Sequence, residues 1–429
     1  MTEEVKARIE SIRKGEIPNG YSESIAGILP NDWASKPLSE ISEVISEQAG
    51  DDDYETLSIS AGIGFVNQAQ KFGKELSGKQ YEKYTVLRKG DFAYNKGNSK
   101  RYPQGCTYRL KERDEAAVPN VFECFRIAEG CPEYYEQLFI NGFMNRQLTR
   151  KINHGVRDDG LLNLTDADFY STVLPVPPLA EQQKIAEMLS TCDRVIELKQ
   201  ELIEKKRRQK KWLMKVLLDP DSGIKLHGFE SRKWKDIPLN KLFSYIRNGF
   251  VGVATPYYVN DGIPYIEGTN IQKGQWDLSD VQHISNDFHK KHPNSVLQKG
   301  DVVVVQSGHV GDCTVVTEDV AGSNSHAIII MTPTSKINPY FCAYFINSSL
   351  GQKRLTGCIT GNTVKHILAS DMKNYILPCP EIDEQDAIAS VFVVMDDELT
   401  SLENEIDVWK QKKKAIMQLL LTGLVRVKV

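Results

Sequence analysis

Two stretches of the chain carry nearly the same pattern and decide its architecture. Residues 174–218 read LPVPPLAEQQKIAEMLSTCDRVIELKQELIEKKRRQKKWLMKVLL, and residues 377–421, offset by 203, read LPCPEIDEQDAIASVFVVMDDELTSLENEIDVWKQKKKAIMQLLL. The prolines favour extended backbone and stop one element before the next begins. The acidic residues that follow suit a helix N-terminus. Each stretch therefore predicts a Pro-rich joint that opens a long helix.

The long helices share one heptad seam, in which the spacing alternates between four and three residues. The first seam is Ile185, Leu189, Cys192, Ile196, Lys199, Ile203, Lys206, Lys210, Leu213 and Leu217; the second is Ile388, Phe392, Met395, Leu399, Leu402, Ile406, Trp409, Lys413, Ile416 and Leu420. This spacing predicts coiled-coil helices of about 39 residues, roughly 58 Å long at 1.5 Å per residue. We expect the two helices to pair with each other, with Met188, Val195 and Leu202 widening the apolar face of the first. The alternative is that each helix is buried on its own domain.

Other landmarks repeat in the same order, which indicates an internal duplication. Trp33, Pro37 and Leu38 return as Trp234, Pro238 and Leu239; Leu87, Lys89, Gly90 and Asp91 return as Leu297, Lys299, Gly300 and Asp301. Short β-branched runs such as 301–305 and 327–330 predict buried strands, with short helices between them. We predict a mixed α/β (α+β) fold with these boundaries: an N-terminal helical extension 1–28 with a helix over 3–14, globular domains 29–178 and 221–380, and long helices 179–220 and 381–429.

The composition is that of an ordinary globular protein and excludes several classes. The 429 residues are 41% hydrophobic and 26% charged, with a net charge of −4 that does not by itself indicate a nucleic-acid binder. No run of about 18 apolar residues predicts a membrane span, and the N-terminus lacks the pattern of a signal peptide. The eight cysteines are scattered without a CxxC, which indicates reduced thiols and a cytoplasmic protein.

No stretch carries a strong catalytic signature. The chain lacks the glycine-loop motifs for nucleotides or S-adenosylmethionine, and it lacks paired metal-ligand spacings. Gly90-Asp91 and Gly300-Asp301 are interpreted as tight turns before strands, not as paired catalytic carboxylates. Asn338-Pro339-Tyr340-Phe341 is similar to the NPPY motif of amino-methyltransferases but lacks its second proline, and we interpret it as a helix start. The four histidines at 283, 289, 292 and 309 are expected to lie at the surface or make polar contacts, with a metal site as the alternative.

Local charge gives the strongest binding signal. Between Lys71 and Arg113, twelve Lys/Arg face four acids, about +8, with tyrosines interleaved. Such a segment predicts a phosphate and base-edge surface, with a solvated loop face as the alternative. The second half has a polar, glycine-turned loop after its strand. The candidate nucleic-acid contacts are Lys96, Lys100, Arg101, Tyr102, Arg109, Arg157, Gln306, Ser307, His309, Lys353, Arg354 and Lys365.

These motifs, in this order and twice over, resemble the specificity (S) subunit of type I restriction–modification systems over nearly the whole chain. The shared features are an early tryptophan, Leu-x-Lys-Gly-Asp, Ser-Gly-x-x-Gly and the Pro-x-Pro joint with Glu-Gln. The resemblance implies two target-recognition domains, each reading one half of a split double-stranded DNA sequence. It also implies an antiparallel coiled coil that spaces the domains and docks two methyltransferase subunits, with restriction/translocase subunits joining that core.

The same resemblance implies a subunit that does no chemistry and binds no cofactor. S-adenosylmethionine, ATP and Mg are then expected on partner subunits. The first half departs from the pattern: Tyr94-Asn95-Lys96-Gly97-Asn98-Ser99 stands where the second half has its Ser-Gly turn, so the two domains are expected to read different sequences. Two other classes stay open. One is a methyltransferase or nuclease with degraded motifs, and the other is a protein-interaction scaffold.

Overall fold

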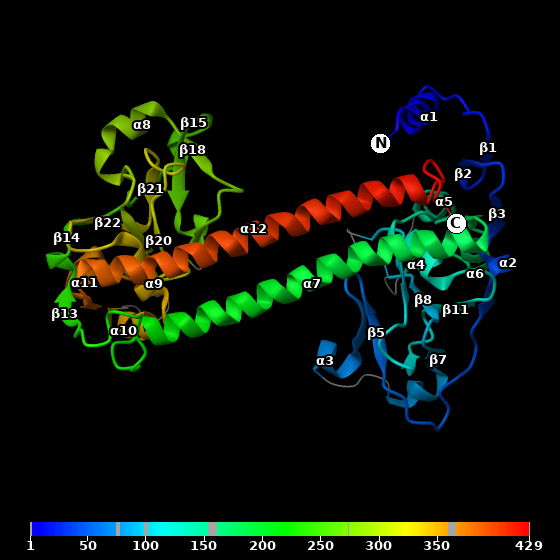
Figure 1. The fold of residues 1–429 in the computed structure, drawn as a ribbon, viewed down its shortest axis with the longest axis horizontal. Helices are drawn as coiled ribbons and strands as arrows, with labels where there is room; N and C mark the ends of the chain where they lie inside the picture. Colours follow the sequence, from blue (N-terminus) through cyan, green and yellow to red (C-terminus); the bar gives the residue numbers. More distant parts are fainter. Residues whose placement is uncertain are drawn as a thin grey trace. The chain divides into compact units, whose positions relative to one another are not determined.

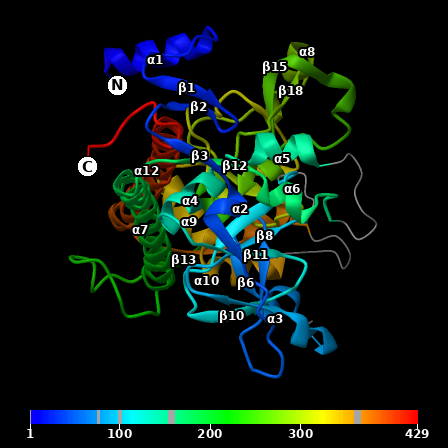
Figure 2. The ribbon, with the colours of Figure 1, turned by 90° about the vertical axis from the view of Figure 1, so that its right-hand side faces the viewer.

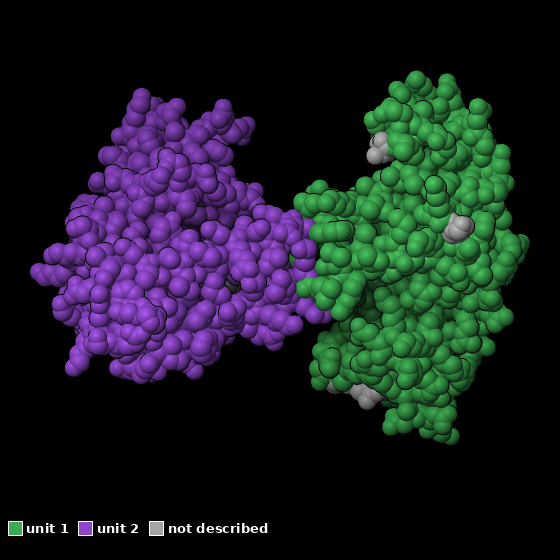
Figure 3. All heavy atoms as spheres, viewed as in Figure 1, with its two compact units in different colours: residues 1–198, 406–429 green, residues 199–405 purple. Residues whose placement is uncertain are grey.

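The computed structural model describes residues 2–73, 78–97, 102–152, 161–272, 274–358 and 366–428 (Figure 1). It forms two compact units, Met1–Leu198 with Ile406–Val429 and Lys199–Glu405 (Figure 3). Each unit contains one globular domain and a part of each long helix. The long helices are α7 (Leu179–Leu217) and α12 (Ile382–Leu420), and both have the expected 39 residues.

The first domain is built around an antiparallel sheet with strand order β4-β11-β8-β9. These strands are β4 (Ser42–Val44), β8 (Phe92–Asn95), β9 (Cys106–Arg109) and β11 (Glu123–Ile127). The pairs around the sheet are β3 (Ala34–Pro37) with β12 (Val173–Val176), β5 (Leu57–Ser60) with β6 (Gly64–Asn67), and β7 (Thr85–Arg88) with β10 (Glu115–Val118). Its helices are α2 (Leu38–Ile41), α3 (Gln68–Phe72), α4 (Pro132–Ile140), α5 (Asn145–Lys151) and α6 (Asp166–Tyr170).

The second domain contains a sheet of the same order, β14-β22-β19-β20. These strands are β14 (Phe243–Asn248), β19 (Val302–Val305), β20 (Cys313–Val315) and β22 (Ile328–Pro333). β13 (Lys235–Pro238) pairs with β23 (Ile376–Cys379), as β3 pairs with β12. A further sheet, absent from the described part of the first domain, joins β18 (Gln282–Ile284), β15 (Tyr258–Glu267) and β21 (Asn324–His326), and β16 (Ile271–Gln272) pairs with β17 (Gln275–Trp276). The helices are α8 (Asn286–Lys291), α9 (Pro339–Asn347), α10 (Ser349–Leu355) and α11 (Ala369–Asn374).

The matching strand order, followed in each domain by three short helices and a strand that leads into the long helix, confirms the internal repeat and the mixed α/β fold. The valine run of β19 shows why the strands could be recognised. Val302 and Val304 lie in one core cluster, and Val303 and Val305 lie in another. Because successive side chains of a strand point to opposite faces, a strand covered on both faces is apolar throughout.

Both Leu-x-Lys-Gly-Asp segments form the expected turns. Gly90 and Gly300 adopt φ values of 99° and 87°, a conformation that glycine adopts without strain. The buried carboxylate of Asp91 accepts a hydrogen bond from the backbone N–H of Arg88 at 2.7 Å, and that of Asp301 accepts one from the N–H of Gln298 at 3.0 Å. These carboxylates therefore hold turns in place, which confirms the structural interpretation.

The N-terminal residues form the expected helix and also a hairpin that the sequence did not reveal. Helix α1 (Glu3–Arg13) is followed by β1 (Tyr21–Ser24) and β2 (Gly27–Pro30). The Arg8 guanidinium donates to the carbonyl of Leu424 at 3.1 Å, and the Tyr21 hydroxyl donates to that of Gly423 at 2.7 Å. This segment thus lies against the residues that follow α12 (Figure 2). Within the described ranges, no helix is long and apolar enough to cross a membrane.

Candidate nucleic-acid and partner interfaces

A tryptophan–glutamate hydrogen bond joins each domain to the start of its long helix. Trp33 Nε1 donates to Glu181 at 3.0 Å, and Trp234 Nε1 donates to Glu384 at 2.9 Å. Glu181 and Glu384 are both buried. The early tryptophan of each repeat therefore satisfies the glutamate of the Glu-Gln pair, which explains why both recur together.

The glutamine that follows each glutamate ties the helix to a second element. Gln182 accepts a hydrogen bond from the N–H of Cys131, just before α4, and donates to the carbonyl of Pro177. Gln385 accepts from the N–H of Asn338, just before α9, and donates to Pro380. A side-chain amide that bridges two backbone segments fixes their relative position. The Glu-Gln joint thus anchors each long helix rigidly in its own domain.

The long helices pair in antiparallel fashion in both units. In the first unit, Ile185 and Leu189 near the start of α7 share a core with Met417 and Leu420 near the end of α12. In the second unit, Leu217 at the end of α7 shares a core with Ile388 and Phe392 at the start of α12. All seam residues are buried or half-buried. The predicted antiparallel coiled coil is confirmed.

Two ion pairs of the coiled coil are related by the duplication. Asp193 of α7 accepts from Lys413 of α12 at 2.6 Å, and Asp396 of α12 accepts from Lys210 of α7. Since the repeat offset of 203 converts Asp193 into Asp396 and Lys210 into Lys413, each pair is the copy of the other. The helices therefore meet through a self-complementary set of contacts, as in a twofold interface.

The polar gaps in the first seam are also ion pairs. Lys199 pairs with Glu405, and Lys206 with Glu398 at 2.7 Å. Such partly exposed pairs contribute about 0–1 kcal/mol each, so they favour one register more than they add stability. The expected role of Met188 and Leu202 is wrong: both are 40% exposed, because α12 covers only the seam. These two side chains belong to the outer face of α7.

Three segments meet beside the sheet of the first domain. The carbonyl of Lys96 accepts a hydrogen bond from the N–H of Leu162 at 2.9 Å, and Gly97 forms an isolated antiparallel β-bridge with Leu161. Gln104 Nε2 donates a hydrogen bond to the hydroxyl of Thr149 at 2.9 Å. These bonds join the β8–β9 connection, helix α5 and the segment before α6. We name this set the loop cluster.

The second domain has the equivalent loop cluster. The carbonyl of Gln306 accepts a hydrogen bond from the N–H of Ile367 at 3.1 Å, and Ser307 forms an isolated antiparallel β-bridge with His366. Gln352 Nε2 donates a hydrogen bond to the carbonyl of Gly311 at 3.1 Å. The β19–β20 connection, α10 and the segment before α11 therefore meet as their counterparts do. Ala327, which follows β21, has a φ of 52°, and its carbonyl accepts from the N–H of Gln306. Strained backbone of this kind is often found at binding sites.

The structure brings many of the predicted DNA contacts to these two loop clusters. Lys96, Tyr102, Gln306, Ser307, His309 and Lys353 lie in or beside them, and His309 and Lys353 are exposed. Lys100, Arg101, Arg157 and Lys365 lie outside the described residues. The assignment of these side chains to DNA stays a prediction.

Lys96 is held by two carboxylates and is not a free cation. Its ammonium lies 2.7 Å from both Glu123 and Asp166. Burial alone lowers the pKa of Lys96, but the hydrogen bonds and charges of Asp166 and Glu123 outweigh burial and raise it. Burial raises the pKa of Glu123, while the hydrogen bond from Lys96 lowers that of Asp166. Lys96 therefore joins β8 to β11 and α6 within the fold.

Most of the other described cations of the 71–113 segment are paired in the same way. Arg109, predicted to contact DNA, pairs with Glu133 and Glu136 of α4. Further pairs are Arg88–Glu47, Lys111–Glu136 and Arg113–Glu55. Arg354 of the second domain donates to Asp236 at 3.4 Å. Five of the twelve cations of the segment, Lys96 included, are thus paired with acids from outside it.

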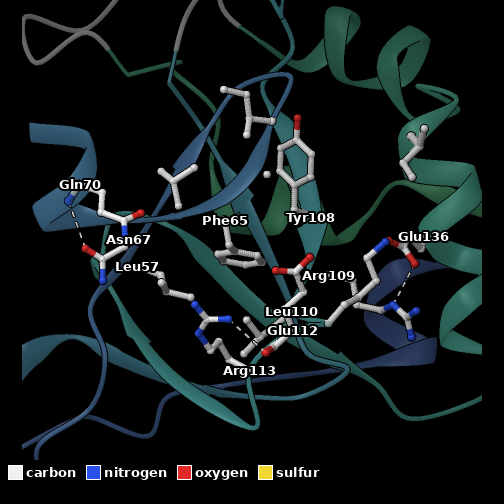
Figure 4. Close-up of a pocket in the computed structure, with 15 residues that line it drawn as sticks. Leu57, Phe65, Asn67, Gln70, Tyr108, Arg109, Leu110, Glu112, Arg113 and Glu136 are labelled. Atoms are coloured by element: carbon white, nitrogen blue, oxygen red, sulfur yellow. Dashed lines mark hydrogen bonds and ion pairs between the residues drawn. The ribbon is translucent and has the colours of Figure 1, made fainter. Parts of the chain in front are cut away.

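A hollow of about 460 Å³ lies beside these pairs, between β6, β9 and α4 (Figure 4). Tyr108, Arg109, Arg113 and Glu136 line it. Figure 4 shows Glu136 and the arginines held by interactions within the chain. Arg109, Arg113 and Glu136 therefore already have partners within the chain.

Sequence reasoning missed the exposed arginines Arg146 and Arg150 of α5. The repeat offered a signal for them, since α5 corresponds to α10, where Lys353 and Arg354 were singled out. Of the four histidines, His289 makes the expected polar contact, through Nδ1 with Asn324, and His292 packs on Phe250 and Phe288. Across the described ranges, no three His, Cys, Asp or Glu side chains gather as a metal site requires.

The segment similar to NPPY is a helix start, as interpreted from the sequence. The side chain of Asn338 accepts hydrogen bonds from the N–H groups of Tyr340 and Phe341 at 2.8 and 3.0 Å, and Pro339 is the first residue of α9. This arrangement satisfies the free N–H groups of the helix. Asn338 is therefore a helix cap, and its side chain is committed to the fold.

Known proteins are similar to this chain in sequence. The chain is 26% identical over 283 residues to the type I restriction enzyme MjaVIII specificity subunit of Methanocaldococcus jannaschii, covering 63% of this chain and 66% of that one. It is 27% identical over 256 residues to the EcoBI specificity subunit of Escherichia coli, covering 55% and 54%. These matches thus span just under two thirds and about half of the two relatives. The MjaIX specificity subunit of M. jannaschii is 23% identical over 95% of this chain and 96% of its own.

Solved structures share the fold at low sequence identity. The S subunit of a type I restriction–modification system from M. genitalium superposes with a TM-score of 0.56 at 14% identity, covering 96% of this chain and 99% of that one. A chain from a structure of the complex assembly and conformational transition of the type I R-M system superposes with a TM-score of 0.57 at 16% identity, covering 92% of this chain and 99% of that one. The model of the type I restriction modification DNA specificity domain matches residues 30–205 and again 231–408. The chain therefore belongs to the family of type I restriction–modification DNA specificity domains.

Proposed function

We propose that the chain is the DNA sequence-specificity subunit of a type I restriction–modification complex, in which each domain reads one half of a bipartite target. The observation that carries this proposal is the double match of the specificity-domain family, once to each domain together with its long helix. Each domain offers its own loop cluster as a reading surface. Because the β8–β9 and β19–β20 connections differ in sequence, the two half-sites differ as well.

In this proposal the coiled coil sets the gap between half-sites and docks the partner subunits. The seam residues hold the two helices together, so docking falls to side chains outside the seam. Met188, Leu198 and Leu202 of α7 and Val394 and Val408 of α12 are exposed and apolar. Exposed apolar side chains in such number suit a protein interface. The internal repeat supplies two related surfaces, which suits two methyltransferase subunits, and restriction/translocase subunits complete the assembly.

Chemistry belongs to the partners in this proposal. S-adenosylmethionine would be held by the methyltransferase subunits, and ATP and Mg by the restriction subunits, so this chain contributes recognition and geometry. The chain has none of the glycine-loop sequences that cradle these groups. A complex that acts on chromosomal DNA works in the cytoplasm.

Methylation-sensitive long-read sequencing tests the proposal. DNA from cells that express the chain with its methyltransferase partner should carry a modified motif of two half-sites separated by a fixed gap, absent without this chain. Methylation that does not depend on this chain, or a continuous motif, would contradict the proposal. Binding of methyl donor by the isolated chain would favour a degraded methyltransferase, and sequence-independent DNA binding by the complex would favour a scaffold.

A further inference from the structure

Helix α5 of the first domain presents two arginines that the fold does not use. Arg146 and Arg150 are exposed, and among the described residues neither has an ion-pair or hydrogen-bond partner. They stand four residues apart, so they lie on one face of the helix, about 40° apart at 3.6 residues per turn. Like charges at this spacing repel each other. The pair therefore costs the isolated fold stability unless an external anion faces it.

The opposite face of α5 is fixed firmly to the domain. Leu148 is buried, and the side-chain amide of Gln147 makes two hydrogen bonds with Val173, donating to its carbonyl at 2.8 Å and accepting from its N–H at 2.9 Å. Lys151 donates to the carbonyl of Asp168 at 3.2 Å. A helix held in this way presents its outer side chains from a rigid support, which binding sites require.

The two arginines line a hollow of about 520 Å³ beside the N-terminal hairpin. Ile25 and Ile28 of the hairpin and Leu424 after α12 make the other side largely apolar, and the exposed carboxylate of Glu23 also lines it. One wall therefore offers guanidinium groups, which bind phosphate oxygens in pairs, and the other offers apolar surface that can contact a sugar. Phosphate and sugar alternate along a nucleic-acid strand.

The position of α5 distinguishes DNA from other anions. Thr149, which stands between Arg146 and Arg150 in the sequence, accepts the hydrogen bond from Gln104 of the β8–β9 connection. The pair thus borders the loop cluster that the proposed function assigns to base reading. We infer that Arg146 and Arg150 bind the phosphodiester backbone of the DNA half-site read by the first domain. This inference rests on the proposed function, and it assigns these residues to positioning and not to base recognition.

The test compares the Arg146→Gln/Arg150→Gln double variant with an Arg88→Gln/Arg113→Gln control in the complex with its methyltransferase subunits. The control also removes two positive charges from the first domain, but both are paired with acids, Arg88 with Glu47 and Arg113 with Glu55. The probe is a duplex carrying the motif mapped by sequencing, titrated at several salt concentrations. Each phosphate contact contributes roughly 0.9 to the slope of log affinity against log salt.

We expect the double variant to lose about 2 units of that slope and roughly 10- to 30-fold of affinity near 0.15 M salt, while the mapped motif stays the same. The control should change the slope by much less, and Arg146→Lys/Arg150→Lys should keep most of it. An unchanged slope in the double variant would overturn the inference. A relaxed half-motif would make the pair base readers, and loss of methyltransferase co-purification would make it a protein contact. A wild-type complex without sequence preference would instead refute the proposed function.

Discussion

The coiled coil predicts a defined change in the recognised gap when both long helices are shortened by one heptad. The deletion removes 198–204 from α7 and 401–407 from α12. Because the helices are antiparallel, both must lose the same central stretch. The pairs Asp193–Lys413 and Lys206–Glu398 lie on either side of the cut and remain opposite each other. The seam spacing of four and three residues is also preserved.

The magnitude follows from helix geometry. Seven residues shorten each helix by about 10 Å at 1.5 Å per residue and turn it by only about 20° relative to an ideal repeat. At roughly 3.4 Å per base pair, this corresponds to a gap about 3 base pairs shorter. Removing about 3 base pairs also rotates one half-site by roughly 100° about the duplex axis relative to the other, at 10–10.5 base pairs per turn. Because the two domains must follow this rotation, we expect slower methylation. The deletion also removes the ion pairs Lys199–Glu405 and Arg207–Glu403, at about 0–1 kcal/mol each.

The assay is methylation of a duplex library in which the gap between fixed half-sites varies by single base pairs. Long-read sequencing of DNA from cells with the variant complex provides the second measurement. As a control, removing only two residues from each helix turns the seam by about 200° and should prevent assembly. Full methylation at the original gap by the heptad variant would show that the methyltransferase subunits set the spacing, and the reasoning would be refuted.

Three other changes have distinct expected outcomes. Trp234→Phe should lower the free energy of unfolding by about 1–3 kcal/mol and Trp33→Phe by less, because Arg426 still donates to the glutamate that Trp33 holds; equal losses in urea titrations would contradict this. Lys96→Met should destabilise the chain more near pH 8 than near pH 5. Burial raises the pKa of Glu123 in the folded chain, so without Lys96 the folded state loses stability as rising pH ionises this carboxyl group. A pH-independent loss would refute this assignment. Finally, DNA affinity should be weak for the isolated chain, whose net charge is −4, and strong in the methyltransferase complex; equal salt-dependent affinities would contradict it.

The long helices were predictable because their periodicity encodes burial directly. A residue that recurs every three or four positions returns to the same face of a helix, so the seam could be read without any tertiary information. The joints were predictable for a similar reason, since proline and an acidic first helical turn act on the neighbouring backbone. The roles of Trp33 and Trp234 were not, because each indole reaches its glutamate across about 150 residues of sequence.

The basic segment shows that a charge count along the sequence does not reveal which cations are paired in the fold. Counting charges along the chain gave +8, but Glu133, Glu136 and Asp166 lie later in the sequence and reach the segment only through the folded sheet. The useful signal was instead a cation without a partner, and only the structure shows which cations those are. Applying the repeat offset to Asp193 and Lys210 could have revealed the twofold ion pairs in advance, because both partners are present in both copies.

The two copies differ in what they retain, and this difference separates framework from reading surface. The Trp–Glu bond, the Glu-Gln joint, the sheet order and the Asp–Lys pairs of the coiled coil occur in both. The second domain adds the β18-β15-β21 sheet, while the first contains the β5–β6 and β7–β10 pairs. Each Asp–Lys pair takes one partner from each copy, so these positions are tied to one another. The middle of the seam has diverged, with Lys199 and Lys206 in the first copy where the second has Leu402 and Trp409. The loop clusters carry no such requirement, so the two domains can acquire different target sequences on a framework that stays the same.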